Sequence, residues 1–253
     1  MNILITNDDG IKANGIIELA KEISTIGNVY VIAPDSERSA TGHAITLHSP
    51  IIVNDEYIDY NIKAYSTSGT PADCVKVGIE ALCKDVNIDL VLSGINNGPN
   101  LGTDVVYSGT VSAAIEGLIQ NKASIAISYD DFNISKETYK KAAKHIVNLI
   151  NNIKDKIELL EDCILNVNIP KDEVKGFKVT TLGERKYDNV VEERFSPRGK
   201  RYIWIGGDPR KVEQDENSDI VAVENGYISI TPVNIEMTDI SKINKLKEIE
   251  CKF

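Results

Sequence analysis

The sequence contains few cysteines, and no two of them lie close together. The four are Cys74, Cys83, Cys163 and Cys251. Because there is no C-x-x-C pair, nothing indicates a zinc site or a redox centre, and we expect ordinary reduced thiols. No apolar run approaches the roughly 20 residues of a membrane-spanning helix, and the first residues lack the basic, apolar and cleavage regions of a signal peptide. These absences favour a cytoplasmic protein.

Basic residues are also in deficit. The chain has 28 Lys and Arg against 38 Asp and Glu, which gives a net charge of -10. An acidic protein repels nucleic-acid backbones and anionic lipid surfaces, so we expect neither polymeric nucleic acid nor a membrane as the main partner. A small anionic substrate is compatible with this charge, because a bound cation reverses the field locally.

The chain does contain enough apolar sequence for one large core, since 42% of its 253 residues are hydrophobic. Short apolar runs alternate with stretches of helical period, which is typical of βαβ units in a parallel sheet. We expect strands at 2–6, 29–33, 45–53, 57–66, 89–93 and 123–128, and helices after the first strand and at 70–83, 110–120 and 136–153. The predicted fold is α/β, a single domain over 1–253 with a doubly wound, Rossmann-like, mostly parallel sheet in residues 1–130.

A C-terminal β-rich extension is expected beyond this core. Strand-like runs occur at 164–169, 177–182, 202–205 and 227–231, and 240–249 has the pattern of a terminal helix. Residues 183–207 interleave charges with Tyr187, Phe195, Tyr202 and Trp204. Such aromatic anchors are typical of interfaces, although a disordered excursion is the alternative. We predict that this arm and the segment 238–253 hold a homodimer or homotetramer.

Polar side chains follow three of the predicted strands, where α/β sheets bind ligands. Asp8 and Asp9 follow the first strand, Ser39 lies in the loop after the second, and Asn96 follows the strand at 89–93. All four offer oxygen, which Mg²⁺, Mn²⁺ and Ca²⁺ prefer. Two adjacent carboxylates repel each other unless a cation compensates them. We therefore predict one divalent cation here, the alternative being a polar turn that only caps the next helix.

A phosphate site is predicted beside these ligands. Ser108, Gly109 and Thr110 open a helix whose free backbone N–H groups would point into the same cleft. Arg38 can add a charge-assisted contact to phosphate or lie in solvent, and Asn97 belongs to a Gly- and Asn-rich stretch that allows backbone to approach a ligand. The combination indicates a metal-dependent phosphohydrolase in which Asp8 and Asp9 are the catalytic carboxylates.

His43 is the histidine closest to these residues in sequence, and a proton-transfer role is conceivable for it. His48 and His145 show that this chain also carries isolated histidines, so a purely structural role is the alternative.

Together these motifs resemble the SurE family of survival-protein nucleotidases. The matching segments are Ile5-Thr6-Asn7-Asp8-Asp9-Gly10, Ala33-Pro34-Asp35 with Arg38-Ser39, Gly69-Thr70-Pro71-Ala72-Asp73-Cys74-Val75, Ser93-Gly94-Ile95-Asn96, Tyr107-Ser108-Gly109-Thr110, Pro197-Arg198-Gly199, Trp204-Ile205-Gly206-Gly207 and Ser229-Ile230-Thr231-Pro232. The resemblance covers nearly the whole chain. Small departures are Ala40, where many members have Gly, and Ser196, where Asp is frequent.

The resemblance implies a phosphatase of nucleoside 5′- and 3′-monophosphates that acts through a metal-activated water. It also implies that Asp8, Asp9, Ser39 and Asn96 occupy the positions of the metal ligands, and that dimers or tetramers form through a protruding β arm and an exchanged C-terminal segment. The alternatives are a receiver-type Mg²⁺-binding signalling module and a nucleotide-binding protein without turnover. The absence of G-x-G-x-x-G after the first strand argues against a dinucleotide-dependent oxidoreductase.

Overall fold

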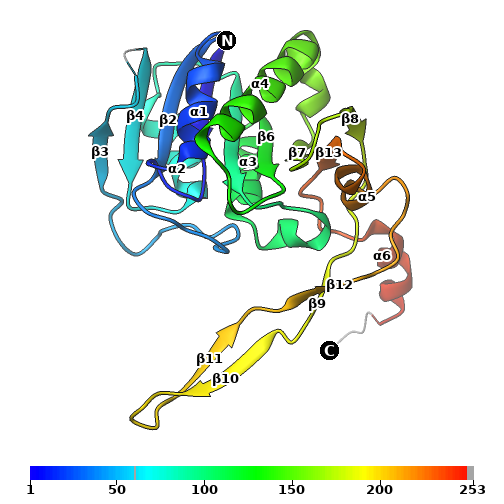
Figure 1. The fold of residues 1–253 in the computed structure, drawn as a ribbon. Coiled ribbons are helices and arrows are strands. Elements are labelled where there is room, and N and C mark those ends of the chain that lie inside the picture. Colours follow the sequence, from blue (N-terminus) through cyan, green and yellow to red (C-terminus); the bar gives the residue numbers. More distant parts are fainter. Residues whose placement is uncertain (60, 250–253) are drawn as a thin grey trace.

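A nine-stranded sheet is the centre of the computed structural model, which describes residues 1–59 and 61–249 (Figure 1). Its order is β3-β4-β2-β1-β5-β6-β7-β13-β8. The strands are β1 Asn2–Thr6, β2 Asn28–Pro34, β3 Val53–Glu56, β4 Ile62–Thr67, β5 Leu90–Asn97, β6 Ala123–Tyr129, β7 Ile164–Ile169, β8 Gly176–Val179 and β13 Tyr227–Val233. The six strands from β4 to β7 in this order are parallel, whereas β3 and β13 pair antiparallel with their inner neighbours. This arrangement confirms the predicted mostly parallel, doubly wound sheet.

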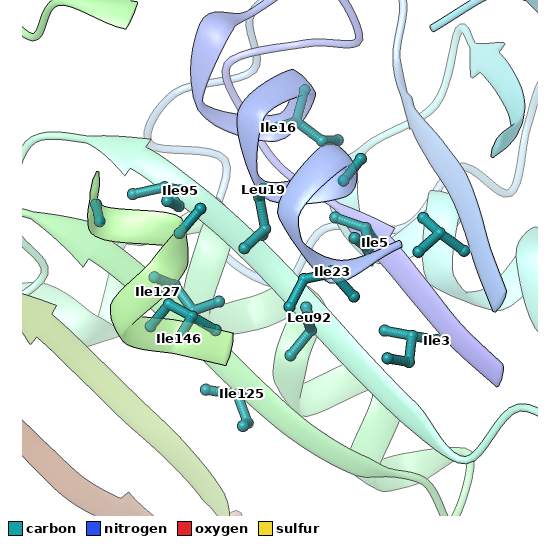
Figure 2. Close-up of a cluster of buried hydrophobic side chains, with 14 of the residues drawn as sticks. Ile3, Ile5, Ile16, Leu19, Ile23, Leu92, Ile95, Ile125, Ile127 and Ile146 are labelled. Carbon is teal, nitrogen blue, oxygen red and sulfur yellow. The ribbon is translucent and has the colours of Figure 1, made fainter. Parts of the chain in front are cut away.

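One face of the sheet is covered by α1 (Asn14–Ile23) and α4 (Lys136–Ile153). Figure 2 shows how Ile16, Leu19 and Ile23 of α1 point toward isoleucines and leucines of the central strands. Each of these three side chains is fully buried, which stabilises the fold by about 1.5–3 kcal/mol per side chain. At Gly15 a Cβ atom would lie 2.1 Å from the Ile95 carbonyl oxygen. The start of α1 is therefore pressed directly against the end of β5.

The opposite face is covered by α2 (Pro71–Val77) and α3 (Gly109–Ile119). α2 begins as predicted, with Thr70 as N-cap and Pro71 in the first helical position, and a π-helical turn over Gly78–Leu82 continues it. Cys74 and Cys83 pack in this layer, and they and Cys163 are free thiols, as expected. Cys251 lies outside the described residues.

A long β arm projects away from the sheet (Figure 1). It contains β9 (Lys186–Asp188) paired with β12 (Asp208–Arg210), and β10 (Val191–Phe195) paired with β11 (Arg201–Ile205), both antiparallel. After it come α5 (Asp219–Glu224), β13, and α6 (Ile240–Leu246) followed by a 3-10 turn at Lys247–Ile249. Of the predicted exchange segment 238–253, residues 250–253 lie outside the description.

Several predicted boundaries were wrong. Residues 45–52 form an irregular surface loop and only Val53 joins β3, while the strand expected at 57–66 begins at Ile62. The strand expected at 89–93 continues to Asn97, because its residues beyond a bulge still pair with β6. The strand expected at 177–182 ends at Val179, and β9, β10, β12 and α5 were not predicted. Among the helices within the described ranges, none has the length and apolar character needed to cross a membrane.

Candidate functional site

The acidic pair sits on a tight turn that begins with a buried asparagine. Asn7 Nδ2 donates to the Gly10 carbonyl oxygen (3.0 Å), and Gly10 N donates to Asn7 Oδ1 (3.2 Å). Gly10 has φ +95°, a left-handed conformation that favours glycine. The Arg38 backbone N–H donates to the Asp8 carbonyl oxygen at 2.7 Å. These bonds fix Asp8 and Asp9 at the carboxyl end of β1, beside the loop that follows β2.

Asp8 is held against the first turn of α3. Its side chain is almost completely buried, and the Thr110 hydroxyl donates to Asp8 Oδ1 at 2.5 Å. A Cβ atom at Gly109 would lie 2.9 Å from both Cβ and Oδ2 of Asp8, so glycine is what allows this approach. Burial raises the pKa of the Asp8 carboxyl, and the hydrogen bond from Thr110 opposes this only in part.

Asp9 lies next to it and is half-buried. Asn97 N donates to Asp9 Oδ2 at 3.1 Å. Burial first, and the neighbouring Asp8 second, raise the pKa of Asp9 to about 6. In the part of the chain that the structure describes, neither carboxylate forms an ion pair with Lys, Arg or His. A cation is the partner that such a pair of carboxylates suits.

Asn96 and Ser39 supply two further oxygens. Asn96 follows the bulge in β5, and its Nδ2 donates to the Gly98 carbonyl oxygen (2.8 Å), which leaves its Oδ1 without a donor among the described residues. Ser39 is exposed, and its hydroxyl donates to Glu37 Oε1 at 2.7 Å. Asp8, Ser39 and Asn96 line one cavity of about 320 Å³. Asp9 lines an adjoining cavity of about 600 Å³.

These four residues fit a hard divalent cation by donor type. Within residues 1–59 and 61–249, no group of three or more His, Cys, Asp and Glu is placed to hold a metal. A cation here would therefore need the neutral oxygens of Ser39 and Asn96 in addition to the two carboxylates. Oxygen donors of this kind are those of Mg²⁺, Mn²⁺ or Ca²⁺ sites.

The start of α3 faces the same cavity. Ser108 lines it and caps the helix, accepting from Val111 N at 3.1 Å. Asn97 lines both cavities, and its backbone N–H is the donor to Asp9. The Thr110 hydroxyl is committed to Asp8, so its side chain orients the carboxylate. The predicted phosphate residues thus lie around the acidic pair, with Thr110 turned toward Asp8.

Arg38 is not among the cavity-lining residues. Its guanidinium Nη2 donates to the Ser68 carbonyl oxygen (3.1 Å) and to Asp35 Oδ1 (3.4 Å), and its backbone supports Asp8. The side chain therefore ties the loop after β2 to the end of β4. Its predicted contact with phosphate stays a prediction.

His43 has a partner on α3. Its Nε2 lies 2.9 Å from Oε2 of the buried Glu116, which also accepts from Lys76 (3.2 Å) and from Gln120 (2.9 Å). Burial would raise the pKa of Glu116, but the hydrogen bonds from Gln120, His43 and Lys76 outweigh it and lower the pKa. His43 lines neither cavity. The geometry supports the structural alternative, in which His43 fastens the Ser39 loop to α3.

A buried knot of amides was missed by the sequence analysis. Asn100 N donates to Asn168 Oδ1 (2.8 Å), Asn100 Nδ2 donates to Ser128 Oγ (2.7 Å), and its carbonyl accepts from Asn166 and Asn168 (2.8 and 3.0 Å). The knot anchors the loop between β5 and α3 over β6 and β7. The available signal was that Asn166 and Asn168 are two apart in a strand and share a face.

Comparisons with known proteins all lead to the same protein family. A family model described as "Survival protein SurE" matches residues 3–189. A protein named 5′-nucleotidase SurE from Alkaliphilus metalliredigens is 50% identical over 253 residues, covering 98% of each chain. One of the same name from Pelotomaculum thermopropionicum is 46% identical, covering 98% of this chain and 95% of that protein. The crystal structure of the SurE protein from Aquifex aeolicus superposes with a TM-score of 0.85 at 38% identity, covering 99% of this chain and 100% of that one.

Proposed function

The chain belongs to the SurE family and is a 5′-nucleotidase, a phosphomonoester hydrolase, and from this premise we propose that it hydrolyses nucleoside 3′- as well as 5′-monophosphates and that hydrolysis depends on one divalent cation per subunit. Mg²⁺ or Mn²⁺ is the proposed ion, and Ca²⁺ is able to occupy the same oxygen ligands. The observation that carries the proposal is the pair of carboxylates, Asp8 and Asp9, which line adjoining cavities and form no ion pair with a basic side chain among the described residues.

Asp8, Asp9, Ser39 and Asn96 would hold the cation, and Ser108 and Gly109 at the start of α3 would receive the phosphate. When bound, the cation would polarise a phosphoryl oxygen and lower the pKa of the attacking water. The backbone N–H groups at the start of α3 would stabilise the charge that develops on the phosphoryl group. Thr110 and the Asn97 backbone would keep the two carboxylates in position, since each donates to one of them (2.5 and 3.1 Å).

A phosphate-release panel tests this proposal. Nucleoside 5′- and 3′-monophosphates would be assayed with Mg²⁺, Mn²⁺ or a chelator, on the wild type, on Asp8→Asn and on Asp85→Asn as a matched, exposed control. We expect chelation and Asp8→Asn each to reduce release by about a hundredfold or more, because several kcal/mol of transition-state stabilisation are lost. Full activity of Asp8→Asn at saturating metal would reject the assigned site. Nucleotide binding without any phosphate release would instead favour a binding protein.

We also propose that the arm, 183–207, holds a homodimer or homotetramer together with the C-terminal segment. Its support is the exposed apolar surface of β10 and β11, where Phe195 and Trp204 are about two-thirds exposed and Ile205 is 87% exposed. Light scattering on Ile205→Asp would test it, with Val179→Asp, an exposed valine of the sheet, as control. Dissociation of the arm variant alone is expected. A wild type that is monomeric and fully active would refute the proposed assembly.

A further inference from the structure

Two tyrosines line the cavity that contains Asp8. Tyr107 directly precedes the start of α3 and is 70% exposed, and Tyr187 belongs to β9 at the root of the arm and is 37% exposed. Neither is needed for the proposed metal or phosphate contacts. Large exposed aromatic rings beside a charged cavity are a feature that those contacts leave unexplained.

The ring of Tyr187 is held in place from its hydroxyl end. Tyr187 Oη donates to Asp104 Oδ2 at 2.6 Å, and Arg185 Nη1 donates to the same oxygen at 3.0 Å. The Thr103 hydroxyl donates to the Arg185 carbonyl oxygen at 2.9 Å. Because these bonds join β9 to the 3-10 helix Gly102–Val106, the ring is preorganised and loses little freedom when a ligand binds.

A second link lies just beneath this one. The buried Asp219 accepts from Gly102 N through Oδ2 and from Gly183 N through Oδ1, both at 2.8 Å. One carboxylate therefore fastens the root of the arm to the loop that leads to Tyr107 and Ser108. The backbone segments that carry the two tyrosines are consequently held together near the start of α3.

The tyrosines extend the cavity into a groove. A cavity of about 260 Å³ shares Asp104, Tyr107 and Tyr187 with the cavity of Asp8, so the two adjoin at these residues. One end of the groove carries the metal and phosphate residues, and the other presents two aromatic rings, of which Tyr187 has its hydroxyl already paired with Asp104. A ligand that suits both ends has a phosphate at one end and a flat, neutral aromatic group at the other.

We propose that Tyr107 and Tyr187 form the surface on which the base of a nucleoside monophosphate stacks while its phosphate lies at the start of α3. This inference rests on the proposed function and adds the residues that distinguish a nucleotide from a simple sugar phosphate. Stacking on an aromatic ring is tolerant of base identity, since every base has a π face. The root of the arm is thereby part of the substrate site.

The cavity of about 600 Å³ beside Asp9 is the competing position for the base. It is lined by Phe132, whose exposed ring lies over Gly98, where a Cβ atom would come within 2.4 Å of the ring. Ser39, Asn96 and Ser108 do not line this cavity, whereas all three line the cavity of the tyrosines. The phosphate end therefore opens toward Tyr107 and Tyr187, and Phe132 becomes a matched aromatic control.

The test compares two substrates that differ only in the base, adenosine 5′-monophosphate and ribose 5-phosphate. The ratio of their kcat/KM values would be measured for the wild type, Tyr107→Ala, Tyr187→Ala, Tyr187→Phe and Phe132→Ala. We expect the ratio to fall about tenfold in each tyrosine-to-alanine variant, within the range for removal of a stacking ring. Tyr187→Phe keeps the ring and should retain most of the ratio, and Phe132→Ala should leave it unchanged. Turnover of ribose 5-phosphate reports in each variant that the site is folded.

Equal losses on both substrates would overturn the proposal, as would a fall in the ratio that occurs only in Phe132→Ala. Calorimetric binding of adenosine 5′-monophosphate provides a readout that does not need turnover. If the wild type binds the nucleotide but releases no phosphate, the proposed function fails, while a loss of affinity in the tyrosine variants still supports the stacking surface. Unchanged affinity in those variants rejects it.

Discussion

Replacing Asp9 by asparagine should stabilise the metal-free protein while it abolishes metal-dependent phosphate release. Burial and the charge of Asp8 raise the pKa of Asp9 from its ordinary 3.8 to about 6. At about 1.4 kcal/mol for each pKa unit, the charged carboxylate costs the folded state about 3 kcal/mol at neutral pH. Since Asp9 is partly exposed, solvent screening reduces this, and we expect a gain of about 1–3 kcal/mol in the free energy of unfolding. The amide oxygen of asparagine can still accept from Asn97.

The gain should depend on pH in a defined direction. A carboxyl whose pKa is raised by folding is charged in both states above about pH 6, where the cost falls on the folded state alone. As the pH falls from about 6 toward the ordinary 3.8, the carboxyl is protonated in the folded state first, so most of the difference between wild type and variant should be lost by about pH 4. Thermal unfolding in a chelator, from about pH 4 to pH 8, measures this. A gain of about 3–10 °C is expected at the upper end for a chain of this size.

Added metal should make the wild type more stable than Asp9→Asn. A cation that binds only the folded wild type stabilises it by mass action, and a variant lacking one carboxylate benefits less. Asp85→Asn, a surface substitution, should follow the wild type under every condition. Equal melting temperatures of wild type and Asp9→Asn in chelator at about pH 7.5, or a gain at pH 4 as large as that at pH 7.5, would refute the account of the apo site.

Three further predictions test single contacts. Asn96→Ala should weaken Mn²⁺ binding about tenfold or more without changing net charge, as measured by calorimetric titration; unchanged affinity would leave Asn96 a loop-shaping role. Gly109→Ala should reduce phosphate release about 10- to 100-fold, because its Cβ would displace Asp8, from which it would lie 2.9 Å. Gly206→Ala, which meets nothing within 4 Å, is the control, and equal activities would show that α3 can move aside. Burial would raise the pKa of Asp73, but hydrogen bonds from Thr46 and Thr70 outweigh it and lower the pKa. The charged carboxylate therefore adds to the free energy of unfolding above about pH 4, and this stabilisation is lost as the pH falls further. Asp73→Asn should accordingly cost about 1–2 kcal/mol in urea unfolding at neutral pH and less at pH 3, and an equal cost at both would contradict this.

Much of the α/β secondary structure could be predicted because its signals lie in neighbouring residues of the sequence. The helix at 136–153 has clear apolar periodicity and was predicted with the observed bounds, and Thr70 and Pro71 marked the start of α2. The extension of β5 to Asn97 could not be seen in the same way. Beyond Ser93 only Ile95 is apolar, among Gly94, Asn96 and Asn97, and Asn96 and Asn97 are strand because β6 pairs with them across the bulge.

In the candidate site, too, local sequence signals could be used, whereas contacts between residues far apart in the sequence could not be predicted. Asp8, Asp9 and Asn96 could be proposed as metal ligands because they come within a few residues of apolar strand sequence. The partner of His43 could not, because Glu116 lies 73 residues away and faces it only after α3 has packed. The knot around Asn100 depends on residues up to 68 positions away, and no local pattern ties them together.

The carboxylate of Asp219 gives the arm a modular attachment. Both of its oxygens are used on backbone N–H groups, one from the loop before α3 and one from the root of the arm. Backbone donors do not depend on side-chain identity, so the junction does not constrain which hairpin lies beyond it. Evolution, or an engineer, is therefore free to lengthen, shorten or replace β10 and β11 while Asp219 keeps the loop in register. The assembly surface that we propose on β10 and β11 could therefore change without disturbing the loop that leads to α3.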